Sequence, residues 1–187
     1  MKKITVVIPN KFNQTAEITL NSLPKGVKVV VVDDVDCKGA NWARNEGFKQ
    51  VDTEYVLFSD NDINWHPGAI ESLLKTLERN PDASYAYGWY EMGGRYYCDL
   101  DFDPKILRLS NYISTMSLIR TKDFPGFDEN IKRFQDWDLW LTMLEQGKEG
   151  VQCNKVIFDT AVRDGITYNG EVGINEAFMA IKNKHNL

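Results

Sequence analysis

Two carboxylates separated by a single residue, Asp60 and Asp62, follow an apolar run at residues 55–58. Such a run is typical of a buried strand, and an acidic pair at its end is costly unless it is solvated, hydrogen-bonded or neutralised by a cation. Mg²⁺ and Mn²⁺ prefer oxygen ligands, and Mg²⁺ is commonly bound by one or two carboxylates together with substrate phosphate oxygens. The pair predicts a site for a metal-bound diphosphate, although Asp and Asn after a strand are also common turn formers.

Polar side chains also follow the two preceding apolar runs, with Asn10 after the first and Asp33 and Asp34 after the second. In open parallel sheets, ligands bind beyond the carboxyl ends of the strands. The chain has no G-x-G-x-x-G motif after the first run and no G-x-x-x-x-G-K-[ST] motif, so phosphate charge must be met by a cation near Asp62, helped by Arg44. An acidic pair after a strand also occurs in phospho-acceptor receiver domains, but that reading leaves the later acidic pair unexplained.

The elements that must position these side chains form three successive units of an apolar run and a helical segment. The units are 4–8 then 14–23, 27–32 then 40–51, and 55–58 then 67–79. Alternation of this kind predicts a parallel sheet, and continuous Val and Ile runs indicate strands that helices cover on both faces. We therefore expect one α/β domain over residues 1–187, with three α/β/α layers and a mostly parallel central sheet.

The second half of the chain has a mixed pattern. Two aromatic, strand-like segments at 84–91 and 96–102 are joined through Gly93 and Gly94, which predicts a hairpin. The segments that follow predict a strand at 113–119, a helix at 136–146, a strand at 155–162 and a closing helix at 174–184.

Composition excludes several classes of protein. The net charge of −5 and the pI near 5.1 argue against binding to nucleic acid, which requires clustered Lys and Arg. The apolar runs are far shorter than the ~20 residues that span a bilayer, so we expect no transmembrane segment. Three widely spaced cysteines indicate neither a disulfide framework nor a zinc site, and a reducing cytoplasm is the expected location.

Several motifs recur in the order in which one enzyme family has them. They are Ile8-Pro9-Asn10-Lys11-Phe12-Asn13, Val32-Asp33-Asp34, Gly39-Ala40 with Ala43-Arg44-Asn45 and Gly47, Asp60-Asn61-Asp62, Gly126-Phe127-Asp128-Glu129, and Gln135-Asp136-Trp137-Asp138-Leu139. Over roughly residues 4 to 165 the chain resembles a family 2 glycosyltransferase with the GT-A fold, a Rossmann-like fold that binds nucleotide-diphospho-sugars. Gln135 departs from the pattern, since the family usually has Glu there, and Val35 replaces a small residue.

The resemblance implies that the first half of the chain, about residues 1–92, binds the sugar donor. Asp34 is similar to the residue that contacts the base, and Asp60 to the residue that contacts the ribose. Asp62, with Asp60 nearby, resembles the ligand of Mn²⁺ or Mg²⁺. The nucleotide-sugar-binding residues implied in this way are Pro9, Asn10, Phe12, Asp34, Arg44, Asp60 and Asn61.

The same resemblance implies that the second half of the chain, about residues 93–187, forms the acceptor side of the site. Asp136 matches the catalytic base, and Glu129, Trp137 and Asp138 match acceptor-side positions. An inverting transfer needs one carboxylate that takes the proton of the acceptor hydroxyl, which fits Asp136. An Asp at the head of a helix is also often only a cap, and we favour such a structural role for Asp138.

A third metal ligand in this family often comes from a C-terminal His. His185 is a poor match in its sequence context, and Asp164 is the alternative. Both His66 and His185 are expected in exposed loop or tail positions.

The resemblance implies a metal-dependent inverting glycosyltransferase acting in polysaccharide or glycan biosynthesis. Its donor would be a nucleoside-diphosphate sugar, most often a UDP-sugar, and its acceptor a hydroxyl-bearing glycan or a lipid-linked molecule. A homo-oligomer or a partner chain could complete the acceptor site. A non-catalytic nucleotide-sugar-binding or scaffold subunit and a sugar nucleotidyltransferase remain open, but Asp136 favours the transferase, since a binding subunit needs no base.

Overall fold

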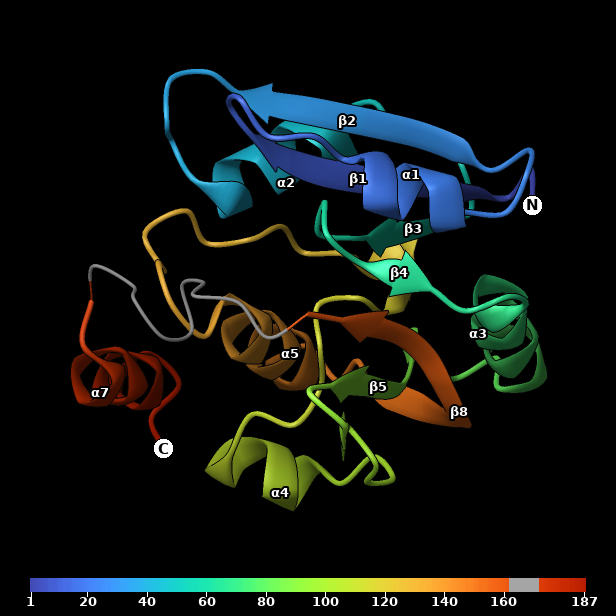
Figure 1. The fold of residues 1–187 in the computed structure, drawn as a ribbon. Coiled ribbons are helices and arrows are strands. Elements are labelled where there is room, and N and C mark those ends of the chain that lie inside the picture. The colour runs from blue at the N-terminus through green and yellow to red at the C-terminus, as the bar shows by residue number, and fades with distance from the viewer. Residues whose placement is uncertain (162–171) are drawn as a thin grey trace.

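The computed structural model describes residues 1–161 and 172–187, which form a layered α/β domain (Figure 1). Its helices are α1 (Glu17–Ser22), α2 (Ala40–Phe48), α3 (Ala69–Arg79), α4 (Pro104–Leu109), α5 (Gln135–Glu145) and α7 (Ile174–Lys184), with a 3₁₀ turn at Thr121–Asp123. Its strands are β1 (Ile4–Lys11), β2 (Lys28–Asp34), β3 (Tyr55–Phe58), β4 (Asn64–Trp65), β5 (Tyr85–Met92), β6 (Arg95–Tyr97), β7 (Leu118–Arg120) and β8 (Gly150–Thr160). None of the described helices has the length and apolar character needed to cross a membrane.

The strands of the described residues form one sheet in the order β2-β1-β3-β7-β5-β8-β4, and β6 pairs with β5. β1 is parallel to β2 and to β3, and β5 is parallel to β8. Because β7 is antiparallel to both β3 and β5, β5 and β8 run in the same direction as the first three strands. The expected mostly parallel sheet with a mixed second half is therefore present, and so is the hairpin of β5 and β6.

Helices cover both faces of the sheet, which confirms the predicted three layers. Along β1, Val7 belongs to one buried cluster, whereas Val6 and Ile8 belong to the other. The cluster of Val7 includes residues of α4, α5 and α7. The opposite cluster includes residues of α3, together with Ala16 and Leu23 at the two ends of α1. α2 lies on the Val7 side so closely that a Cβ atom at Gly47 would overlap Val7, so only glycine fits there.

Some predicted boundaries were wrong where side chains bond to the local backbone. The strand predicted over 96–102 ends at Tyr97, and α4 follows, because the carboxylate of Asp103 accepts from the backbone N–H groups of Lys105 and Ile106 while Pro104 occupies the first turn. The strand predicted over 113–119 begins only at Leu118, since serine and threonine side chains and backbone make a turn at 114–117.

Two further differences concern strands. β8 begins at Gly150, five residues before the predicted start, and its predicted end at Val162 lies outside the described residues. β4 was not predicted, because its two residues carry no periodic pattern and are extended only by pairing with β8. The closing helix α7 has the bounds that the sequence predicted.

Candidate functional site

The carboxyl ends of β1, β2 and β3 carry a connected set of polar side chains. The Asn10 amide donates to Asp33 Oδ1 at 2.7 Å and to the Gln14 carbonyl at 3.1 Å, and its own oxygen accepts from Asn61 at 2.8 Å. Asn61 also donates to Gln14 Oε1 at 3.0 Å. Asn10 thus fixes the loop after β3 against the ends of β1 and β2, as the predicted location requires.

Thr19 of α1 holds the same loop from the other side. Its buried hydroxyl donates to the Asp60 carbonyl at 2.8 Å and accepts from the Ile63 N–H at 2.9 Å. The two bonds bracket Asp62 between fixed backbone positions. Thr19 was not among the predicted site residues, because nothing in the local sequence links it to a loop that lies 41 residues away.

The Asp34 carboxylate organises the entry into α2. Its two oxygens accept from the backbone N–H groups of Lys38 at 2.8 Å and Gly39 at 2.6 Å, and the residue is buried. Gly39 has φ +107°, a conformation that L side chains rarely adopt. Whether Asp34 also contacts a base stays a prediction.

Arg44 of α2 is the buried cation of this edge, with 4% of its surface exposed. Its Nη2 donates to Asp60 Oδ1 at 2.7 Å, and its Nη1 donates to Asn41 at 3.1 Å and to Gln135 at 3.2 Å. The guanidinium also lies 5.2 Å from the ring centre of Phe127. It therefore links the loop after β3 to the start of α5.

The carboxylates after β3 have the donor chemistry that a divalent cation requires. Asp60 uses one oxygen for Arg44 and its side chain is 40% exposed, and Asp62 is half-buried. Within the described part of the chain, no three His, Cys, Asp or Glu side chains are grouped so as to hold a metal. The residues present fit the mode in which one or two carboxylates share the ion with phosphate oxygens.

Asp136 lies in the first turn of α5, and its Oδ1 accepts from the Trp137 N–H at 3.0 Å. Burial raises the pKa of Asp136 above its ordinary value, against the lowering effects of a hydrogen bond from Asn111 and the charge of Arg44. A carboxyl with a raised pKa beside a polar edge is suited to accept a proton. Asn111 carries no sequence signal for this position.

The other predicted acceptor-side residues have different surroundings. Glu129 is exposed and accepts from Asn45 of α2 at 2.9 Å, and Asn45 also bonds to the backbone of Phe127. Trp137 is fully buried, and its indole N–H donates to the Leu107 carbonyl at 2.6 Å, so its ring forms core and offers no face to a sugar.

Of the remaining donor-side residues, Pro9 is buried within β1, whereas Phe12 is 50% exposed beyond its end. Asp164 lies outside the described residues.

Asp138 faces α7 instead of the polar edge. Its carboxylate binds Lys184 Nζ at 2.7 Å and His185 Nε2 at 2.9 Å, and His185 Nδ1 lies 2.8 Å from Glu145 Oε1. Lys184 also pairs with Asp128 at 2.8 Å. The expectation that His185 lies in an exposed tail was wrong. Its side chain is 1% exposed and pairs with the carboxylates of Asp138 and Glu145.

The buried imidazole makes stability depend on pH. Burial lowers the pKa of His185, but hydrogen bonds and charges of Asp138 and Glu145 outweigh it, so that the net shift is upward. A raised folded-state pKa adds stability that is full below the ordinary value of 6.5 and is lost as the pH rises through the raised value. We expect the free energy of unfolding, measured by urea unfolding, to fall across this window.

The control for this prediction is His185→Gln, which keeps a hydrogen-bond donor but cannot titrate. Lys184 does not interfere, because although burial lowers its pKa, the carboxylates of Asp128 and Asp138 raise it above 10.5 overall. If His185 causes the fall, the difference in free energy of unfolding between wild type and His185→Gln should change with pH. A difference that is the same at every pH would show that another group causes the fall, and it would contradict the prediction.

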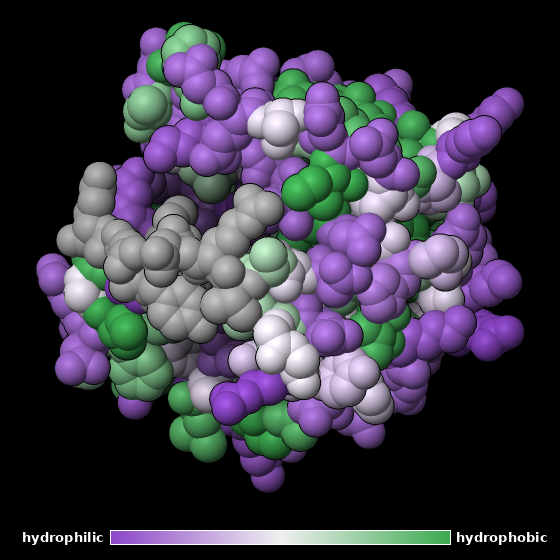
Figure 2. Space-filling view, in the orientation of Figure 1, coloured by the Kyte–Doolittle hydropathy of each residue, from purple (hydrophilic) through white to green (hydrophobic). Residues whose placement is uncertain are grey.

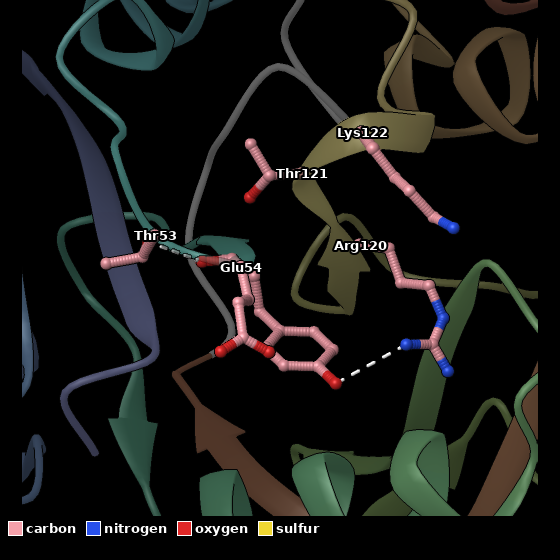
Figure 3. A pocket seen from close by; sticks show the side chains of 6 residues that line it. Thr53, Glu54, Arg120, Thr121 and Lys122 are labelled. Carbon is pink, nitrogen blue, oxygen red and sulfur yellow. Dashed lines mark hydrogen bonds between the residues drawn. The ribbon is translucent and has the colours of Figure 1, made fainter.

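A surface pocket lies away from these residues. It has a volume of about 450 Å³ and is lined by Thr53, Glu54, Tyr55, Arg120, Thr121 and Lys122, at the amino end of β3 (Figure 3). Arg120 is engaged there by the Ala83 and Leu77 carbonyls. On the face in Figure 2, apolar surface is scattered, with separate spots over α1 and near α4. Neither feature contains the predicted site residues.

Residues 11–124 match a family model described as glycosyl transferase family 2. The matched span includes the Arg44 helix and the Asp60–Asp62 loop but ends before Asp136.

Two curated relatives are glycosyltransferases by name. A pre-mycofactocin glycosyltransferase of Mycobacterium tuberculosis is 25% identical over 233 residues, which cover 97% of this chain and 48% of the relative. An uncharacterized glycosyltransferase of Bacillus subtilis, YwdF, is 23% identical over 82% of this chain and 62% of the relative. The chain thus spans about half the length of the first relative.

The solved structure of S. aureus TarS 1–349 in complex with UDP-GlcNAc superposes with a TM-score of 0.76 at 18% identity, over 98% of this chain and 65% of that chain. Full-length TarS gives a TM-score of 0.73 over 39% of its length. The likeness confirms the predicted GT-A fold.

Proposed function

Because this chain belongs to glycosyl transferase family 2, we propose that it moves a sugar from a nucleoside diphosphate to a hydroxyl acceptor with inversion at the anomeric carbon. The donor end is the edge formed by Asn10, Asp34 and Asn61, and a UDP-sugar is the first candidate because UDP-GlcNAc is bound by TarS. The acceptor is a glycan or lipid-linked molecule, and the product serves polysaccharide or glycan synthesis.

The arrangement around Arg44 carries this proposal. The guanidinium bonds to Asp60 on the donor side and to Gln135 at the start of the helix that bears Asp136. A metal-binding carboxylate and a base with a raised pKa are therefore joined through one buried cation. A nucleotide-binding subunit needs the first of these groups but has no use for the second.

The chemistry assigned to the residues is a single displacement. Asp136 accepts the proton of the acceptor hydroxyl as that oxygen attacks the anomeric carbon from the face opposite the diphosphate. The bond from the anomeric carbon to the diphosphate oxygen breaks, and the nucleoside diphosphate leaves. A divalent cation, Mn²⁺ or Mg²⁺, held by Asp62 and Asp60 would neutralise the charge of the leaving diphosphate.

Thermal unfolding tests the donor and metal assignments. With UDP-GlcNAc at a hundredfold excess over its Kd in the presence of Mn²⁺, we expect Tm to rise by roughly 5 to 10 °C, because the ligand binds the folded state alone. The shift should disappear when Mn²⁺ is omitted and in Asp62→Ala.

The matched control is Asp52→Ala, which removes an exposed carboxylate at the amino end of β3, paired only with Lys28. This variant should keep the full shift. A shift that persists in Asp62→Ala would overturn the metal assignment, and saturable binding without turnover of any acceptor would favour a binding subunit.

A further inference from the structure

Arg44 needs acceptors, and of the three side chains that accept from it in the described part of the chain, one is charged. A guanidinium donates five N–H bonds and accepts none, and removing it from water is costly unless its charge is matched. Asp60 supplies the charge, whereas Asn41 and Gln135 supply neutral oxygens. The Arg44 Nε is buried and has no hydrogen-bond partner among residues 1–161 and 172–187. The neutral acceptors are therefore part of how this cation is held.

Gln135 uses both ends of its amide. Its Oε1 accepts from Arg44 Nη1 at 3.2 Å, and its Nε2 donates to the Ile131 carbonyl at 3.2 Å. Since the guanidinium can only donate and the carbonyl can only accept, these partners fix the orientation of the amide. The Ile131 carbonyl also accepts from Asn41 of α2 at 3.2 Å. The amide thus joins α2, the loop before α5 and the first turn of α5.

We infer that Gln135 is a positioning residue, which holds Arg44 between Asp60 and Asp136 and requires a neutral amide to do so. The inference rests on the proposed function for its catalytic consequence. A carboxylate at this position could accept from Arg44 but could not donate to Ile131, and its charge would compete with Asp60 for the guanidinium. Because the Gln135 side chain is neutral, it does not offset the charge of Arg44, which acts on the carboxylates of Asp60 and Asp136.

The test compares Gln135→Glu with Gln135→Met in the full chain. In Gln135→Glu, a new negative charge next to Asp136 and on Arg44 should move the acidic limb of kcat/KM upward by about 0.5 to 1 pH unit. Gln135→Met has similar length and removes both hydrogen bonds without adding charge. It should lower kcat several-fold and move the acidic limb less than Gln135→Glu does.

Among the described residues, Arg44 acts on the Asp136 carboxylate from α2, and Asn111 donates a hydrogen bond to it. Burial raises the pKa of the Cys98 thiol to about 12, and the charge of Asp136 adds to that rise. The Asp60 carboxylate is bound to Arg44. None of these groups changes in either variant, so a difference between the two pH profiles comes from the charge at position 135.

Identical acidic limbs in Gln135→Glu and Gln135→Met would overturn the inference and reduce Gln135 to a packing role. Wild type that turns over no donor would instead defeat the proposed function. In that case, the titration of the Asp136 carboxyl carbon by NMR decides the inference without any activity, since its midpoint should still be higher in Gln135→Glu than in Gln135→Met.

Folding is a separate readout. If Gln135→Glu is unstable at neutral pH, its Tm deficit relative to wild type should shrink as the pH falls, because a protonated carboxyl can both accept from Arg44 and donate to Ile131. A deficit that is constant with pH would contradict the requirement for a neutral group.

Discussion

Asp136→Asn is expected to lower kcat for sugar transfer by about 10²- to 10⁴-fold, the usual contribution of a general base. The amide keeps the shape of the side chain and can still accept from the Trp137 N–H, but it cannot take a proton from the acceptor. Donor binding should remain, because the donor-side contacts come from other residues. Steady-state kinetics with a saturating donor measure the loss, and the ligand-induced Tm shift measures binding.

The control for this variant is Asp52→Asn, the same change of carboxylate to amide near the amino end of β3, away from the candidate site. It should leave kcat unchanged. If Asp136→Asn retains more than about a tenth of wild-type kcat, Asp136 acts as a helix cap and another group takes the proton.

Asp138→Leu is expected to destabilise the fold by about 3 to 5 kcal/mol, the usual effect of removing one partner of a buried ion pair. The change leaves Lys184 and the buried His185 without their shared carboxylate. For a chain of this size the loss corresponds to a fall in Tm of roughly 6 to 20 °C, measured by calorimetry. The contacts between α5 and α7 should weaken first.

Asp128→Asn is the matched control, because it removes the other carboxylate that binds Lys184. The Asp128 side chain is 31% exposed. An exposed pair contributes about 0 to 1 kcal/mol, so this variant should melt close to wild type. Equal losses in the two variants would show that the Asp138 ion pairs add no more than a surface pair.

Hydrophobic pattern was enough to predict the layers and the first three strands. The continuous run at Tyr55–Phe58 is buried throughout, as helices on both faces require. The hairpin followed from its two glycines, and Gly94 indeed has φ +76°. The pattern failed at α4, although the Asp103-Pro104 signal for a helix start was present in the sequence.

Residue type and motif order were enough to select Asp60 and Asp136 as candidate site residues, and their roles stay predictions. The site was not predictable where an ordinary polar side chain acts across a long sequence separation. Gln135 and Arg44 are 91 residues apart, and nothing near either residue indicates that they bond. The same holds for His185, whose place near the end of the chain suggested exposure until its carboxylate partners were known.

Among the described strands, β8 comes last in the sequence, and it lies inside the sheet with β5 on one side and β4 on the other. During synthesis, β4 and β5 are therefore made before β8. Until β8 pairs with them, their unpaired strand edges can pair with other chains. Asn64 meets Asp159 across 95 residues of chain, and contacts of such separation form slowly. Partly made chains that lack β8 are therefore expected to aggregate more readily than the complete sheet.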